Sequence, residues 1–514
     1  MIKMKDTKNI KSNNEKENII VWLDFTTYAY TNFGIISALS KLDKFNFIGI
    51  ISDKNDMSFF QNQQIISFKE LVYYPDSYIN KPLFNMDNLK KFEKLYDLNI
   101  WLDAYTDRYF YKYLNYFHKF SKEEILSIIE NSISFFVDIL EKHKPKLILM
   151  QQAGENVSNL LLYKIAKKMK IKVLMPVPIH IHDTIIMSDN MGGREIFDGF
   201  KKLMINYTDE SEMYNEEFIK KISNSKSVDV QLSYNYYNST FSQKINHYIK
   251  RLTHDPEPVF MNIGKTKLKV IKYKYQSYFE LKKRKQFLED KSIKVIEDKK
   301  FLLFPLHTEP ESKILAQNPF YSNQITLIEN VARSIPINFV LYVKEHPIQK
   351  TKLWRSVEDY KKIIALPNVK LVHPSVDSQE LISKSQGIVV ISGSVGFEAL
   401  FYKKPIILFG DEYYEGLSMV TKITSLTTLP EVIKNTLSNF KFNNKELNAL
   451  MQIINNQTIS VPYFSIMKDG IMLSSIQRNK NDFNLTIKHF EKFYAMHKNY
   501  FELIAKTIYL KLKI

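Results

Sequence analysis

Residues able to bind or transfer a charged group follow five short, mainly apolar runs in the second half of the chain. The runs span 301–304, 339–343, 369–372, 388–391 and 406–409, and the groups after them are 307–311, 344–347, 373–374, 392–396 and 410–412. Each group holds a His, a carboxylate or a loop of Ser and Gly. Ligands of open parallel sheets bind beyond the carboxyl ends of the strands. The sequence therefore predicts a binding site along one sheet edge.

The loop Ser392, Gly393, Ser394, Val395, Gly396 is the sharpest of these signals. It joins an apolar run to the start of a helical segment, so free backbone N–H groups and two hydroxyls would face outward at a positive helix end. Such a loop binds phosphate. It lacks the Gly-Lys-Ser/Thr end of a Walker loop and the full G-x-G-x-x-G spacing. The alternative is that Ser394 acts only as a helix N-cap.

His346, with Lys344 two residues before it and a Pro after it, could donate to the same phosphate. An imidazole can also deliver a proton to a leaving group, although a lone His is more often structural. Glu309 and Glu311 flank Pro310, and one of them could be a general base while the other caps the turn. His180 and His182 alternate as metal ligands do, but no third ligand lies near them, so no metal site is predicted.

The order of apolar and helical segments predicts the fold class. In the second half, helical segments fit at 324–334, 356–364, 379–384 and 395–402. In the first half, the runs 19–23, 47–51, 146–150 and 171–175 alternate with helical segments such as 121–142 and 160–169. This alternation is typical of parallel strands with helical crossovers. We expect an α/β protein with two Rossmann-like domains that face each other across a cleft.

The expected divisions are a disordered leader at 1–17, an N-terminal Rossmann-like domain at 18–200, a helical basic insert at 201–300, a C-terminal Rossmann-like domain at 301–415 and a helical region at 416–514. The last segment, 485–514, is predicted to be an amphipathic basic helix whose simplest role is to pack against one of the domains, and we expect the C-terminal helices together to brace both domains.

The amino-acid composition argues against several classes of protein. The 514 residues are 45% hydrophobic and 25% charged, close to ordinary globular usage, which argues against wholesale disorder. The absence of cysteine removes disulfides, thiolate metal sites and a Cys nucleophile, and it fits a reducing compartment. The net charge is +17, yet only seven of the 72 basic residues are Arg. Nucleic-acid recognition favours Arg, so no nucleic-acid partner is predicted.

Localisation follows from apolar runs and charge. The first 18 residues contain no signal-like apolar region, and no window approaches the ~20 apolar residues of a membrane span. We expect a cytoplasmic chain that could touch the inner face of a membrane. Residues 265–300 carry thirteen Lys/Arg against five Asp/Glu. This stretch could lie on anionic phospholipid or another anionic polymer, or it could be a solvated helix face.

Several of these motifs carry a resemblance. Phe304-Pro305-Leu306-His307 with Pro310-Glu311, Tyr342 to Pro347, Gly393 to Leu400 and Lys404 to Gly410 resemble the bacterial capsule polysaccharide biosynthesis family. Those proteins are similar to GT-B glycosyltransferases, including Kdo and sialic acid transferases that use CMP-sugars. The resemblance spans 301–414. Gly154-Glu155-Asn156 and Met175-Pro176-Val177-Pro178 are similar to segments that precede this domain in such proteins.

The resemblance implies transfer of a sugar from a nucleotide-activated donor, for example a CMP-sugar, to a capsular or other surface polysaccharide or a lipid-linked glycan. It implies that His346 and Ser394 bind the donor phosphate and that Glu398 binds a donor hydroxyl. The supporting contacts to the phosphate would come from Lys344, Ser392, Gly393 and Gly396. Glu311 is the preferred acid/base, with His307 and Glu309 beside it. Gln152, Glu155 and Asn156 would lie on the acceptor side.

The resemblance also implies no cofactor beyond the nucleotide-sugar substrate, and no metal, since no DxD motif stands in the matching region. Two alternatives stay open. The chain could transfer a polyol phosphate from a CDP-activated donor, as teichoic-acid polymerases do, or it could be a non-catalytic component of a capsule assembly or export machine.

Overall fold

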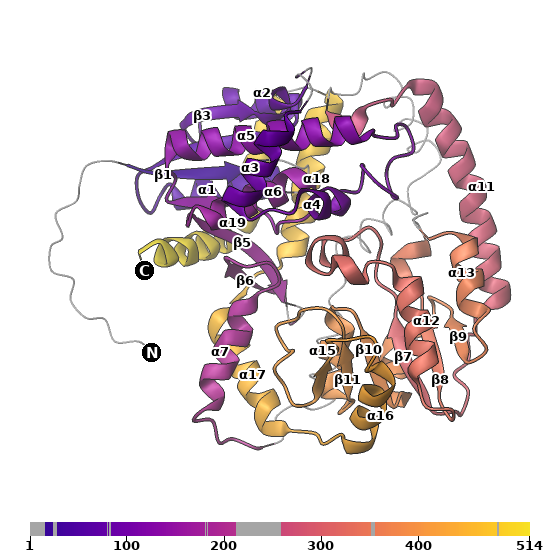
Figure 1. Cartoon of the computed structure of the whole chain (residues 1–514). Helices are drawn as coiled ribbons and strands as arrows, with labels where there is room; N and C mark the ends of the chain where they lie inside the picture. Colours follow the sequence, from indigo (N-terminus) through magenta and orange to yellow (C-terminus); the bar gives the residue numbers. More distant parts are fainter. Residues whose placement is uncertain are drawn as a thin grey trace.

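The computed structural model describes residues 16–23, 28–79, 81, 84–179, 181, 183–211, 259–350, 355–480 and 483–513. Two sheets form two separate layers, each covered by helices on both faces (Figure 1). Almost all of the expected leader, residues 212–258 of the expected insert, and His180 and His182 lie outside the described residues. The predicted class, α/β with two Rossmann-like units, is confirmed.

The first sheet has seven strands in the order β13-β6-β5-β4-β1-β2-β3. Its strands are β1 (Glu17–Trp22), β2 (Phe45–Ile51), β3 (Phe68–Tyr73), β4 (Leu147–Leu149), β5 (Lys172–Ile179), β6 (Thr184–Ser188) and β13 (Ile459–Ser460). The pairs among β1 to β5 are parallel, whereas β6 is antiparallel to both β5 and β13. The central strands are apolar and buried on both faces, as a sheet covered by helices on two sides requires.

The helices of this unit are α1 (Ala29–Leu39), α2 (Lys54–Asn62), α3 (Met86–Tyr96), α4 (Ile100–Thr106), α5 (Lys122–His143), α6 (Val157–Lys168) and α7 (Arg194–Met204), with the 3-10 turn η1 (Tyr74–Ser77). Helix α5 begins at a capping box between Ser121 and Glu124. The predicted helices at 121–142 and 160–169 are confirmed, with α6 beginning three residues earlier than expected.

The second sheet has six strands, all parallel, in the order β12-β11-β10-β7-β8-β9. They are β7 (Phe301–Pro305), β8 (Val340–Lys344), β9 (Val369–Val372), β10 (Gly387–Val390), β11 (Ile406–Leu408) and β12 (Val420–Lys422). The helices of this half are α11 (Lys267–Lys291), α12 (Gln324–Ser334), α13 (Val357–Ile364), α14 (Ser378–Lys384), α15 (Ser394–Phe401), α16 (Leu429–Asn439) and α17 (Asn444–Gln457). Its short turns are η2 (Phe260–Asn262), η3 (Lys313–Gln317), η4 (Pro319–Tyr321) and η5 (Pro347–Lys350). The five predicted strands and four predicted helices are confirmed within one residue at each end.

The expectation of a purely helical chain after residue 415 is wrong at two places. Strand β12 extends the second sheet beside β11, and β13 closes the edge of the first sheet. Helices α18 (Tyr463–Lys480) and α19 (Phe483–Lys513) return to the first unit, as Figure 1 shows in yellow. A Cβ on Gly34 of α1 would lie 2.5 Å from the Phe501 ring of α19. The prediction that the terminal helix packs on one domain is confirmed.

Each sheet has a point where the strand order reverses. In the first sheet the chain runs from β1 outward to β2 and β3, then returns to β4 on the other side of β1. In the second it runs from β7 to β8 and β9, then returns to β10 on the other side of β7. Crevices at such switch points are where ligands of open α/β sheets bind. The segments after β7 and β10, and the segment after β4, are therefore the places to look for a site.

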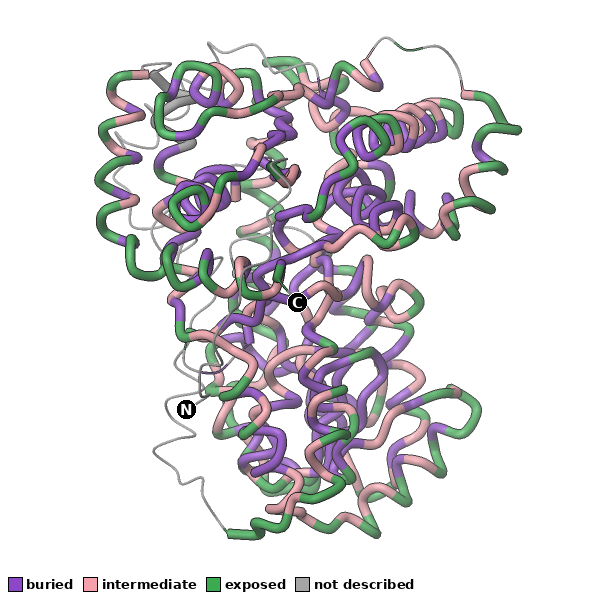
Figure 2. The backbone as a smooth tube through the Cα atoms, turned by 90° about the vertical axis from the view of Figure 1, so that its left-hand side faces the viewer, coloured by how far each residue is buried: buried purple, intermediate pink, exposed green. Residues whose placement is uncertain are grey.

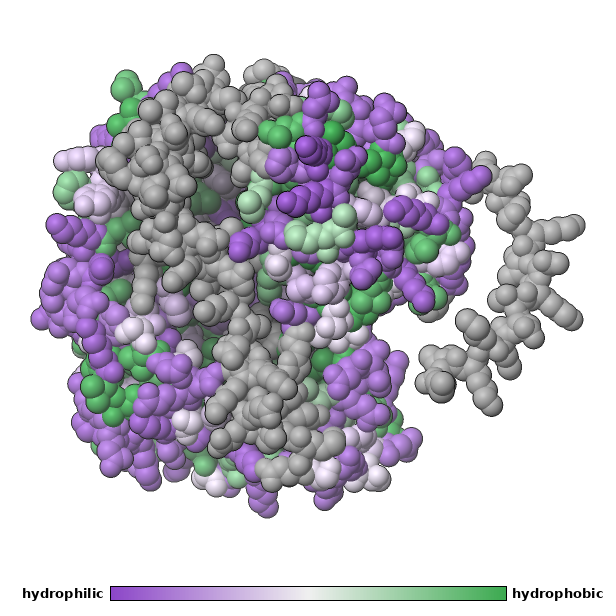
Figure 3. Space-filling model, turned by 180° about the vertical axis from the view of Figure 1, so that it is seen from behind, coloured by the Kyte–Doolittle hydropathy of each residue, from purple (hydrophilic) through white to green (hydrophobic). Residues whose placement is uncertain are grey.

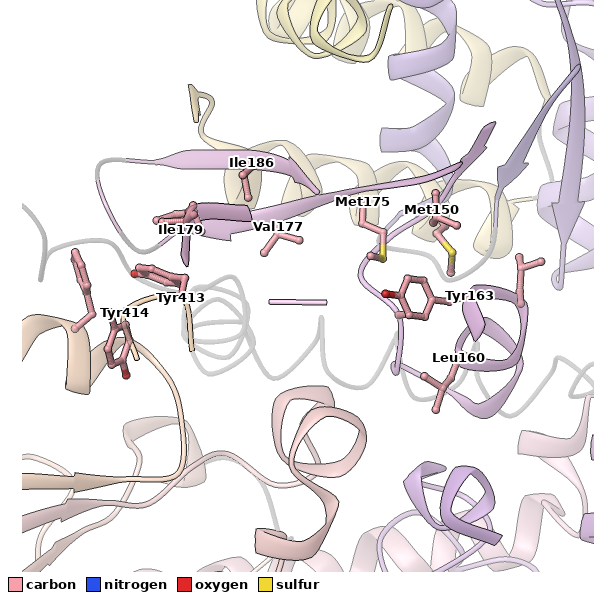
Figure 4. Packing of buried hydrophobic residues seen from close by; sticks show 14 of the residues in the cluster. Met150, Leu160, Tyr163, Met175, Val177, Ile179, Ile186, Tyr413 and Tyr414 are labelled. Carbon is pink, nitrogen blue, oxygen red and sulfur yellow. The ribbon is translucent and has the colours of Figure 1, made fainter. Parts of the chain in front are cut away.

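The two units share apolar packing as well as separate cores. Figure 2 shows buried backbone running through both units. One buried cluster contains residues of both sheets. Figure 4 shows part of it, with Tyr413 and Tyr414 of the second unit beside Ile179 at the end of β5, and Val177 and Met175 farther along that strand. This packing fixes the carboxyl edge of one sheet against the other. No described helix is both long and apolar enough to cross a bilayer.

Candidate functional site

The loop after β10 turns sharply at Gly393 and runs directly into α15. Gly393 has φ 99° and ψ −178°, a region that favours glycine. A Cβ there would also lie 3.3 Å from Cε1 of His307. Gly393 is the N-cap of α15 and makes no side-chain capping bond, so the alternative that Ser394 is only an N-cap is wrong. The Ser394 side chain instead hydrogen-bonds Glu398 one turn later.

A carboxylate already occupies the anion position of this loop. The Gly393 N–H donates to Oε1 of Glu412 at 2.5 Å, and the Lys313 ammonium lies 3.1 Å from the same oxygen. The Glu412 side chain is 3% exposed. Because a carboxylate and a phosphate oxygen compete for the same donors, a phosphate could use these donors only by displacing Glu412. The roles of Glu412 and Lys313 were missed from sequence.

His307 sits between this loop and Glu311. The Ser392 N–H points to its Nε2 at 3.4 Å, and its Nδ1 lies 3.9 Å from Oε2 of Glu311. Burial lowers the pKa of His307 to about 3, and the nearby cations Lys313 and Arg355 and the His346 ring act in the same direction. The ring is therefore neutral at ordinary pH, with its proton on Nδ1, the nitrogen that faces Glu311. It can donate a hydrogen bond but brings no charge.

The two glutamates around Pro310 have different surroundings. Glu309 is buried and accepts from Gln324 Nε2 at 2.5 Å, from Arg355 at 3.3 Å and from the Tyr113 hydroxyl at 3.3 Å. The Glu311 side chain is 40% exposed. The proposed catalytic role of Glu309 is thus better replaced by a structural one, because its carboxylate is enclosed by these partners. Glu311 remains the candidate base.

Arg355 holds the loops after β7 and β8 together, and sequence reasoning missed it. Its guanidinium is 2% exposed and binds Glu345, Glu309 and the His307 carbonyl, the last at 3.1 Å. Glu345 also accepts from the Tyr360 hydroxyl at 2.5 Å and from the His346 N–H at 2.6 Å. A guanidinium can serve several acceptors in one plane, which a Lys cannot. The sequence did contain a signal for Arg355, because Arg is rare in this Lys-rich chain.

His346 and Lys344 flank this network at the end of β8. The Ile348 N–H points to Nδ1 of His346 at 3.3 Å, which leaves Nε2 as the ring's donor nitrogen. The half-buried ring can therefore present an N–H to an anion. Lys344 is buried and close enough to act on Glu398.

Glu398 on α15 is held in an unusual state. Burial raises the pKa of Glu398 to about 7; the negative charge of Asp377 adds to the rise, while the Ser394 hydrogen bond and Lys344 oppose it. At neutral pH this carboxyl is half protonated, so it can donate as well as accept a hydrogen bond.

The three residues predicted for the acceptor side have different surroundings in the structure. Glu155, in the turn before α6, binds Arg108 at 2.7 Å and the Ser312 hydroxyl at 3.1 Å, which brings this turn of the first unit directly against the Glu311 segment. Gln152 lies in the same turn, and its Nε2 is buried with no hydrogen-bond partner in the described part of the chain. Asn156 is a correction: it is 1% exposed and is the N-cap of α6 in a capping box with Asn159.

Gly396 is a second correction. It is buried in α15, and a Cβ there would overlap the Tyr414 hydroxyl, which donates to the Gly393 carbonyl at 2.8 Å. Glycine is needed at 396 for this close approach of Tyr414, and the residue does not face the anion position. Among the residues described, no group of three or more His, Cys, Asp or Glu is arranged to hold a metal ion.

Comparison with known proteins matches this region to a family model. Residues 208–453 match the family model described as "Capsule polysaccharide biosynthesis protein". This range contains the second sheet and every candidate residue of its carboxyl edge. The resemblance drawn from the motifs is thereby confirmed.

Individual relatives are more distant. Protein FixF of Sinorhizobium fredii is 27% identical over 125 residues, which is 24% of this chain and 29% of that protein. A β-Kdo 2,7-transferase structure, KpsC of Thermosulfurimonas dismutans, has a TM-score of 0.30 at 13% identity and covers 71% of this chain and 87% of its own. UDP-GlcNAc 2-epimerase of Neisseria meningitidis has a TM-score of 0.26 at 14% identity, covering 85% and 99%. These similarities are too weak to carry an argument about activity.

Proposed function

We propose that the chain is a glycosyltransferase that moves a sugar from a nucleotide-activated donor to a capsular or related surface glycan. One observation carries the proposal: at the switch point of the second sheet, the Gly393 N–H and Lys313 already hold a carboxylate where a donor phosphate would bind. Buried Ser392 Oγ lies in the same loop and has no hydrogen-bond partner within the described residues. The whole arrangement lies in the region matched by the capsule family.

The proposed donor step begins when a phosphate displaces Glu412. The Gly393 N–H, Lys313 and the N-terminus of α15 would then face the phosphate, and His346 would approach from β8. The bond between the sugar's anomeric carbon and the phosphate oxygen breaks, and negative charge grows on that oxygen. Preorganised donors stabilise such charge more in the transition state than in the ground state. We propose that no metal ion is needed for this stabilisation.

The proposed acceptor step uses Glu311. Its carboxylate would take the proton from the acceptor hydroxyl as that oxygen bonds to the anomeric carbon. Neutral His307 lies beside this base, with its Nδ1 3.9 Å from Oε2 of Glu311. The Glu155 contact with Ser312 places the first unit beside this base, so we propose that the 18–200 domain holds the acceptor glycan, free or lipid-linked, and the 301–415 domain holds the nucleotide. The domain divisions and the cytoplasmic location stay predictions.

A nucleotide panel tests this function. We expect at least one of CMP, CDP, UDP, GDP or their sugars to raise the melting temperature, because ligand at 100 times its dissociation constant stabilises by about 2.7 kcal/mol. His346→Ala and Ser392→Ala should reduce the shift, whereas Lys434→Ala on α16 should keep it. Absence of any shift across the panel would count against a transferase. Product analysis with CMP-activated and CDP-activated donors then separates sugar transfer from polyol-phosphate transfer.

Donor affinity should also depend on pH through Glu398. The carboxyl is mostly neutral at pH 6 and mostly ionised at pH 8, because its pKa is about 7. Ionised Glu398 repels a phosphate held by its partner Ser394, so affinity should fall about fivefold from pH 6 to pH 8 if binding raises that pKa by one unit, and by at most about tenfold for a larger rise. Titration with a nucleotide sugar, whose phosphodiester does not ionise in this range, measures the effect.

The control for this dependence is Glu398→Gln, which should bind equally at both pH values. A pH dependence unchanged in this variant would assign the effect to another group.

The raised pKa of Glu398 should also affect the stability of the fold. The folded protein keeps a proton that the unfolded chain releases above about pH 4.5, so Glu398 lowers the free energy of unfolding as pH rises toward 7.

A further inference from the structure

Helix α11 exposes a continuous apolar stripe to solvent. Leu268 is 80% exposed, Tyr275 68% and Tyr278 64%, and Ile271 and Phe279 are exposed with them. The spacing of these five residues is three, four, three and one, so they lie on one face of the helix. Large apolar side chains gathered in this way on a water-facing surface usually mark an interaction site.

Lysines border the stripe on both sides. Successive helical residues turn by about 100°, which places Lys267, Lys274 and Lys285 along one margin, and Lys269, Lys272 and Lys283 along the other. Lys282 lies within the stripe itself. Across the 25 residues of α11 there are nine Lys or Arg and three Asp or Glu, a net charge of 9 − 3 = +6. In Figure 3 hydrophobic and hydrophilic side chains lie next to one another over much of the visible surface.

The opposite face of α11 holds the helix in place. Arg284 and Leu288 are buried, and the Phe287 ring lies 6.2 Å from Tyr360 of α13. Toward the N-terminal end, the Tyr273 ring lies 4.4 Å from Tyr116, and Lys269 donates to the Phe117 carbonyl at 3.1 Å. The helix is thus tied to both units (Figure 1). It cannot turn its apolar stripe inward without losing these contacts.

We propose that the exposed face of α11 binds the surface of a bilayer containing anionic phospholipids. An apolar stripe with aromatic side chains fits the boundary between headgroups and acyl chains, and lysines along both margins fit the anionic phosphates beside it. Tyrosine is enriched at this boundary because its ring is apolar and its hydroxyl stays wet. The positive charge of the helix favours an anionic bilayer over a neutral protein surface. The proposal does not depend on the transferase activity.

Vesicle co-sedimentation of the full chain tests the proposal. We expect binding to vesicles of phosphatidylcholine with phosphatidylglycerol, and little binding to phosphatidylcholine alone. Raising the salt from 0.1 M to 0.5 M should weaken binding, because the Debye length shortens. Changing Lys272, Lys274, Lys282 and Lys283 to Gln should lower the partition coefficient by about tenfold or more.

Apolar contact is tested separately. The triple variant Leu268→Ser, Tyr275→Ser, Phe279→Ser should also lose about tenfold or more of its binding to anionic vesicles. The matched control changes Ile205, Ile337 and Leu510 to Ser; these are also exposed but lie on other elements, and their loss should leave binding unchanged. All variants should melt near wild type. Tyr278→Trp should show a blue-shifted emission on anionic vesicles and quenching by brominated acyl chains.

Three outcomes would overturn the proposal. They are equal binding to neutral and anionic vesicles, unchanged binding by the stripe variant, and an indole emission of the Tyr278→Trp variant that does not respond to vesicles. If the stripe variant instead converts an oligomer of the wild-type chain into a monomer in light scattering, with no change in vesicle binding, the face is an interface between two copies. Nucleotide-induced stabilisation should be the same in all these variants, which separates failure here from failure of the proposed function.

Discussion

Glu311→Gln should abolish most sugar transfer while leaving the protein folded and able to bind nucleotide. The side chain is 40% exposed beside His307, so the amide fits without opening a cavity. It removes the proton acceptor, and the loss of a general base lowers turnover by about 10²-fold to 10⁴-fold. Release of the nucleotide product in the presence of acceptor measures the rate, and the nucleotide-induced melting shift measures binding.

Glu309→Gln is the matched comparison two residues away. It removes a charge that faces buried Arg355, so it should lower the melting temperature. The folded fraction should keep a turnover much closer to wild type. If Glu311→Gln were fully active and Glu309→Gln folded but inactive, the base would be Glu309, and the burial argument used here would be wrong.

Local sequence patterns were sufficient for most of the fold. Strand β7, for example, contains the apolar run Phe301 to Phe304 bounded by Lys300 and Pro305, and α12 matches its predicted bounds. Strand β12 was missed because its three residues, Val420 to Lys422, include a Thr and a Lys and form no apolar run. Strand β13 has two residues and exists only because β6 provides an edge for it.

The candidate site was predictable only where its residues follow a strand. His307, Glu311, His346 and Ser392 were found in this way. The pairings that support them were not found, because each joins residues far apart in the sequence: Glu412 meets Lys313 from 99 residues away, and Glu309, itself a candidate, meets Tyr113 from 196 residues away. A one-dimensional pattern holds no information on such pairs, although seven arginines among 72 basic residues could have drawn attention to Arg108 and Arg355.

Arg355→Ala should cause the largest loss of stability of any single change considered. The guanidinium is 2% exposed and neutralises two carboxylates, Glu345 at 0% and Glu309 at 8% exposure. Removing one partner of a buried ion pair costs about 3–5 kcal/mol, because an uncompensated charge stays inside. Chemical denaturation at pH 7 measures the change in the free energy of unfolding, with Arg333→Ala as the control.

The Arg333→Ala control separates the effect of losing a buried arginine from the effect of losing a positive charge. Arg333 is 71% exposed and faces Glu329 at 3.8 Å on the same helix, so its loss should cost about 0.5 kcal/mol or less. In Arg355→Ala, His346 should lose its position as well, since its N–H is held by Glu345, so the folded fraction of this variant should bind nucleotide more weakly than wild type. Equal stability of the two variants would show that Arg355 does not hold the loops after β7 and β8 together.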